Sequence, residues 1–92
     1  MIAYKVVRGD LGAWCDRGYV YEPGTVLESD TLLYFYRTVG EVRTGAWWRR
    51  VTPPKVIIEA ELDDPETITH PQTGEDYLVT RRCKVLRIIS RD

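Results

Sequence analysis

The 92-residue chain carries 13 basic and 14 acidic residues, a formal net charge of −1 at neutral pH. This balance excludes a protein that binds polyanions through its total charge, and 43% hydrophobic residues argue against disorder. The length suits one hydrophobic core, so we expect a single domain over residues 1–92. No apolar run approaches the roughly 18 residues that a bilayer span requires, so we expect no membrane partner.

Cys15 and Cys83 are the only cysteines, and His70 is the only histidine. Nothing at the N-terminus resembles a signal peptide, because Met1 is followed directly by a strand-like segment. We therefore expect reduced thiols and a cytoplasmic protein. Zinc ligands normally come in close pairs, which these residues do not form, and no glycine-rich phosphate loop is present. We expect neither a metal nor a cofactor.

The first part of the chain shows strand signals separated by turns. Residues 2–8 are rich in β-branched and aromatic side chains and end at a Gly-Asp pair, which predicts a strand. Residues 11–18 have two glycines and no periodicity, which predicts a loop whose Trp14 enters the core. Glu22-Pro23-Gly24 suits a type II turn, so residues 19–27 are predicted to form a β-hairpin.

The middle of the chain gives one clear signal and one conflict. Residues 32–36 are a continuous apolar run, which predicts a strand buried on both faces. Within residues 38–51, apolar residues fall near helical spacing, but Gly40 and Gly45 each weaken a helix by up to about 1 kcal/mol. We expect one short irregular helix here, ended by Pro53-Pro54.

The last part of the chain again favours strands. Residues 55–62 alternate in polarity and are predicted to form a strand. Residues 63–76 are polar with two prolines and a glycine, which predicts a long exposed loop. Residues 77–80 and 83–90 supply one or two closing strands. The expected fold class is α+β, with a small, mainly antiparallel or mixed β-sheet and one short irregular helix.

Residues 18–24 read Gly18-Tyr19-Val20-Tyr21-Glu22-Pro23-Gly24. They resemble the glycine–aromatic–x–Tyr–Glu–x–Gly stretch of a family of small uncharacterised proteins common in phages and prophages. An apolar segment and two further strands follow in that family, and residues 32–36, 56–62 and 80–89 take the same order. The family's Gly-aromatic-His-x-Cys signature is missing from residues 32–37, so no role tied to His or Cys is carried over. The resemblance implies a phage- or bacteria-type accessory protein without an assigned activity.

An enzyme hypothesis comes from four residues, Arg8, Ser29, Glu59 and Glu61. They follow the order of the phosphate-binding Arg, the Ser/Thr and the Glu-x-Glu in ADP-ribosyltransferases, where the Glu stabilises an oxocarbenium-like ribose. The chain is short for a complete nicotinamide pocket. A Glu-x-Glu is also typical of a sheet face turned to water, so a solvated face is the alternative interpretation.

A nucleic-acid hypothesis comes from Trp47-Trp48-Arg49-Arg50, because indoles stack on bases and guanidinium groups bind phosphates. Residues 37–55 hold five basic residues against one acid, a local charge of +4. A sheet can bring a second basic stretch close, formed by Arg81, Arg82, Lys84, Arg87 and Arg91. The alternative is that one Trp is core, the other covers it, and the arginines pair weakly with the acids of residues 59–66.

We favour a third hypothesis, a protein interface. Trp, Tyr and Arg are the residues most enriched at binding hot spots. Three Trp and six Tyr are more than so small a domain buries, which predicts an exposed apolar patch. We therefore expect binding to a protein partner or homo-oligomerisation through Trp47, Trp48, Arg49, Arg50 and Arg43.

Overall fold

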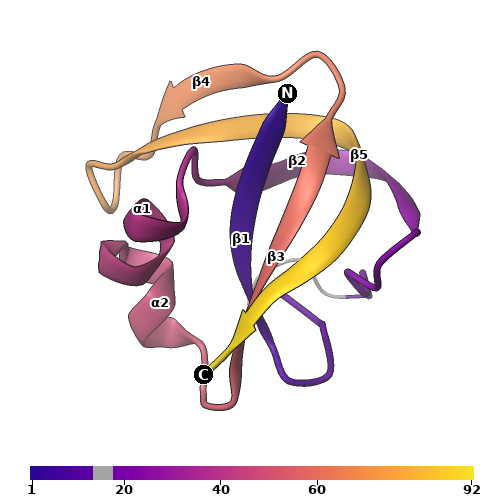
Figure 1. Ribbon diagram of the computed structural model, residues 1–92. Helices are drawn as coiled ribbons and strands as arrows, with labels where there is room; N and C mark the ends of the chain where they lie inside the picture. The colour runs from indigo at the N-terminus through magenta and orange to yellow at the C-terminus, as the bar shows by residue number, and fades with distance from the viewer. Residues whose placement is uncertain (14–17) are drawn as a thin grey trace.

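The computed structural model describes residues 1–13 and 18–92. Over these residues the chain forms one five-stranded antiparallel sheet and two short helices beside it (Figure 1). The elements are β1 Ile2–Arg8, β2 Val26–Phe35, α1 Val39–Thr44, α2 Ala46–Arg50, β3 Lys55–Leu62, β4 Glu66–Thr69 and β5 Asp76–Arg91. The mainly antiparallel α+β fold is confirmed, with two helices where one was expected.

The sheet is curled, and its long strand β5 bends with it (Figure 1). Its order is β1-β3-β5-β2, and β4 pairs with the first part of β5. The curl brings β1 to the end of β2, where the backbones of Tyr4 and Tyr36 exchange hydrogen bonds of 2.8 and 2.7 Å. The two strands at the ends of the sheet order therefore touch at this point.

Strand alternation divides the buried side chains between two cores. Leu33 and Phe35 point into an inner core, enclosed by the curled sheet, which also holds Val7, Tyr21, Val56, Ile58 and Val85. Tyr36 belongs to an outer core, formed with Val6, Val42, Val51, Ile57, Tyr77 and Val79. Leu32 and Tyr34 pack against the outer core. The prediction that residues 32–36 are covered on both faces is confirmed.

Gly45 divides the predicted single helix into α1 and α2. Thr38 caps α1, because its Oγ1 accepts the amide of Glu41 at 3.1 Å. At Gly45 the backbone is extended, with φ −79° and ψ 166°. The Tyr36 ring occupies the space that a Cβ at Gly45 would need. Any residue can adopt this backbone conformation, but only glycine leaves room for the close approach of this ring.

The predicted hairpin over residues 19–27 is wrong, although its turn is present. Thr25 N–H donates to the carbonyl of Glu22 at 3.0 Å, and Gly24 has φ +90°. However, Val26 pairs with Lys84 of β5. Tyr21 bonds instead through its amide to the loop before it, and its ring is fully buried in the inner core. Trp14 and Cys15 lie outside the described residues, and Cys83 is buried.

The predicted loop over residues 63–76 contains the strand β4, so that prediction is wrong in part. β4 pairs with the start of β5, and Ile68 packs against the outer core. The two predicted closing strands form the single 16-residue strand β5. Burial of Ile68 and pairing with β5 give order to a segment whose composition is typical of a loop.

Candidate functional site

The helix α2 carries four of the five predicted interaction residues on the outer side of the sheet. Trp47 and Trp48 are both half-buried, whereas Arg49 and Arg50 are exposed. Neither indole is therefore lost inside a core, and neither stands free in solvent. Arg43, the fifth residue, is exposed at the end of α1.

Trp47 covers the outer core. Its ring lies 6.0 Å from that of His70 and 6.3 Å from that of Tyr77, measured between centroids. The guanidinium of Arg50 lies 4.9 Å from the Trp47 ring centroid. Trp47 thus has a packing role and at the same time holds a cation at the surface.

Two cations lie close to the Trp48 ring. The Nζ of Lys55 is 4.7 Å from its ring centroid and the Cζ of Arg43 is 6.0 Å away. Lys55 Nζ also donates to the Trp48 carbonyl at 2.6 Å. Arg43 is held further by Ser90 Oγ at 3.0 Å and Asp92 Oδ2 at 3.3 Å. Both cations are therefore fixed beside the indole.

We name this surface the α2 face and define it as Arg43, Trp47, Trp48, Arg49, Arg50 and Lys55. Arg43 forms an ion pair with exposed Asp92. Arg49 and Lys55 form no ion pair with any residue in the described part of the chain. The α2 face therefore presents positive charge that this chain compensates only in part.

Glu75, which no sequence pattern singled out, anchors α2. Its Oε1 accepts hydrogen bonds from the amide of Ala46 at 3.0 Å, the hydroxyl of Tyr36 at 3.0 Å and the hydroxyl of Tyr77 at 2.7 Å. Burial alone would raise the pKa of Glu75, but these hydrogen bonds outweigh it and lower the pKa below 4.5. Burial raises the pKa of Tyr36, so its hydroxyl stays a neutral donor.

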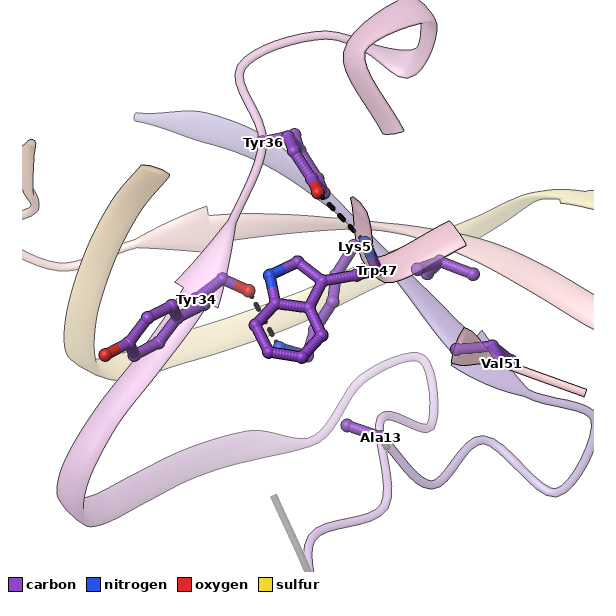
Figure 2. Close-up of a pocket in the computed structure, with 7 residues that line it drawn as sticks. Lys5, Ala13, Tyr34, Tyr36, Trp47 and Val51 are labelled. Carbon is purple, nitrogen blue, oxygen red and sulfur yellow. Dashed lines mark hydrogen bonds between the residues drawn. The ribbon is translucent and has the colours of Figure 1, made fainter. Parts of the chain in front are cut away.

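Lys5 is buried where β1 and β2 diverge. Its Nζ donates to the Tyr34 carbonyl at 2.7 Å and lies 5.3 and 5.2 Å from the ring centroids of Tyr21 and Phe35. Figure 2 shows the Trp47 indole beside it at a cavity of about 20 Å³. The cavity is lined by Lys5, Val6, Ala13, Tyr34, Tyr36, Trp47 and Val51. This volume holds about one water molecule, which is too little for a metabolite.

The four residues of the ADP-ribosyltransferase hypothesis are not brought together. Arg8 stands four residues beyond the β1 position that pairs with Glu59, roughly 13 Å along the strand. It forms an ion pair with Asp10 at 3.3 Å. Ser29 lies on β2, which β5 separates from β3, and its hydroxyl bonds to Thr31. No shared dinucleotide site results from this placement.

The two glutamates of this set also have local partners. Glu59 accepts hydrogen bonds from Arg87 at 3.1 and 3.3 Å, and its side chain is only 12% exposed. Glu61 is 50% exposed and pairs with the amino group of Met1 at 3.1 Å. The solvated-face interpretation therefore describes Glu61 but not Glu59.

The second basic stretch lies along β5, where acids of the same chain pair with two of its five cations. Arg82 pairs with Glu28 at 3.0 Å and Asp63 at 3.2 Å. Arg87 pairs with Glu59, as described above, and Arg81 donates to the carbonyl of Asp30. These arginines therefore do not extend the uncompensated charge of the α2 face into a continuous basic strip.

Within the described residues, no group of three His, Cys, Asp or Glu side chains is placed to hold a metal ion. No helix in that part of the chain is both long enough and apolar enough to cross a bilayer. Comparison with known proteins finds no matching family model, no matching curated protein and no matching solved structure.

Proposed function

We propose that this chain is a protein-docking module whose α2 face binds a carboxylate-bearing protein surface. The observation that carries the proposal is the half-buried Trp48 indole with Lys55 and Arg43 against its ring, next to exposed Arg49. Indole and guanidinium groups are the side chains that most often anchor protein interfaces. An accessory role of this kind also suits the phage- or bacteria-type proteins that the sequence resembles.

The arrangement of the cations favours binding because it lowers the entropic cost. Lys55 is restrained by the Trp48 ring and carbonyl, and Arg50 by the Trp47 ring. Ordering a long side chain costs about 0.5–1.5 kcal/mol when it happens on binding, and part of that cost is already met in the folded protein. The positive charge selects an acidic partner and speeds the encounter with it.

Nucleic acid is the alternative ligand, and two features make us rank it second. Base stacking needs an open ring face, but cations lie against the Trp48 ring. Phosphate binding gains from a long basic strip, and two of the β5 arginines, Arg82 and Arg87, pair with acids of the chain. The scattered Arg8, Ser29, Glu59 and Glu61 give the enzyme hypothesis no geometric support.

Calorimetry with two probes of equal charge, an oligoglutamate peptide and an oligothymidylate, tests the proposal. We expect tighter binding of oligoglutamate. Arg49→Ala should weaken it severalfold, whereas Lys84→Ala, which removes an exposed cation from β5, should leave it unchanged. Tighter binding of oligothymidylate with a steep salt dependence would establish nucleic-acid recognition instead. Equal effects of the two substitutions would show that the α2 face is not the binding site.

A further inference from the structure

A cleft lies at a different end of the molecule from α2. The turn between β3 and β4 is at the top of Figure 1, whereas α2 is at the lower left. Beside this turn is an open cleft of about 520 Å³, which we name the β3–β4 cleft. It is lined by Leu32, Asp63, Asp64, Glu66, Val79, Thr80, Arg81 and Arg82. Its volume is within the range that accommodates several side chains of a partner.

The chemistry of this cleft complements that of the α2 face. Partly buried Leu32 gives it apolar wall atoms, and its charged lining consists of three acids and two arginines. Arg82 is paired with Asp63 and Arg81 donates to the carbonyl of Asp30. Exposed Asp64 and Glu66 form no ion pair with any residue that the structure describes, so the acids of the cleft outnumber its cations by one. An apolar surface beside uncompensated carboxylates suits a ligand that presents aromatic and guanidinium groups together.

We infer that the acidic partner of the α2 face is the β3–β4 cleft of a second copy of this chain. The inference rests on the proposed docking function and names its partner. Two α2 faces placed against each other would oppose like charges, which is unfavourable, whereas the α2 face and the cleft are complementary. The two surfaces lie apart on one molecule, so the contact is head-to-tail, and it leads to a ring or a growing chain.

Two double variants, each disabling one surface, test this contact. Arg49→Ala/Arg50→Ala removes charge from the α2 face, and Asp64→Asn/Glu66→Gln removes charge from the cleft. Asn suits position 64, where φ is +46°. In sedimentation at low salt, the wild-type mass should rise with concentration and fall when salt is added. Each variant alone should remain monomeric, and an equimolar mixture should form a 1:1 dimer but nothing larger.

The sedimentation results can contradict self-association without contradicting docking through the α2 face. If the wild type stays monomeric, the second copy is not the partner. If the cleft variant associates as well as the wild type, the cleft is not the surface that binds the second copy. In both cases, binding of oligoglutamate at the α2 face would still support docking to another acidic protein. If the Arg49→Ala/Arg50→Ala variant associates like the wild type, self-association does not use the α2 face. Circular dichroism and melting curves of both variants establish that they are folded.

Discussion

The hydroxyl of Tyr36 donates a 3.0 Å hydrogen bond to the carboxylate of Glu75, 39 positions further along the chain. The same carboxylate oxygen accepts the amide of Ala46, the first residue of α2. Tyr36 also fills the space beside Gly45, where the helices separate. The position of the α2 face therefore depends on a contact between the end of β2 and the loop before β5.

Replacing Glu75 should loosen this anchor. Glu75→Ala removes the acceptor of three hydrogen bonds and leaves partly buried donors unpaired, so we expect a loss of about 2–3 kcal/mol. Glu75→Gln keeps one acceptor oxygen without the charge and should lose less. Urea unfolding measures both, with exposed Glu22→Ala as the control. A loss no larger than that of the control would contradict the role of Glu75.

The same carboxylate should make stability depend on pH. The folded-state pKa of Glu75 lies below its ordinary value of 4.5, so the unfolded chain takes up its proton first as the pH falls. The stabilisation is therefore complete above about pH 5 and is lost as the pH drops through the folded-state pKa. We expect the difference in unfolding free energy between wild type and Glu75→Gln to shrink with acidification. A constant difference from pH 6 to about pH 3 would show that Glu75 is not the group responsible.

Two glycine-to-alanine substitutions should differ in their effect on stability. Gly45→Ala puts a methyl group where the Tyr36 ring lies, and overpacking of this kind costs about 1–3 kcal/mol. Gly40→Ala lies in α1 with only ordinary contact to Thr38, so it should be neutral or gain up to about 1 kcal/mol. Thermal unfolding distinguishes the two. Similar melting temperatures would mean that the Tyr36 contact imposes no constraint at Gly45.

Buried Lys5 should matter more than an exposed lysine. Lys5→Met leaves the Tyr34 carbonyl without the Nζ donor, which we expect to cost about 1–3 kcal/mol. Lys84 is an exposed residue of β5, so Lys84→Met should change stability by no more than about 0.5 kcal/mol. Hydrogen exchange at the Tyr4 and Tyr36 amides should accelerate only in the Lys5 variant. Unchanged exchange would show that Lys5 does not hold β1 and β2 together.

The strands that local composition predicts well are those rich in β-branched residues, β1 and β3. Both were predicted with the bounds that the structure has. The hairpin over residues 19–27 failed because a distant strand, β5, supplies the partner of Val26. β4 was missed because it has four residues, of which only Ile68 packs against a core. The partner of Val26 and the formation of β4 both depend on pairing with the distant strand β5, and no local sequence pattern predicts such pairing.

The candidate site was predictable only where it is continuous in sequence. Trp47 to Arg50 are adjacent, so their proximity needed no fold. Lys5 could have been found, because strict alternation places it on the same face as buried Ala3 and Val7. Glu75 could not, because it lies in a polar loop whose position depends on the pairing of β4 with β5.

The most direct test of docking through the α2 face is a map of nuclear magnetic resonance shifts while oligoglutamate is added to isotopically labelled protein. If the α2 face binds the peptide, the largest shifts fall on the Trp48 indole and the amides of Arg49 and Arg50. The amides of Arg82 and Lys84, which also carry exposed cations, should move little. Shifts that centre on those β5 residues and leave α2 unchanged would contradict docking through the α2 face.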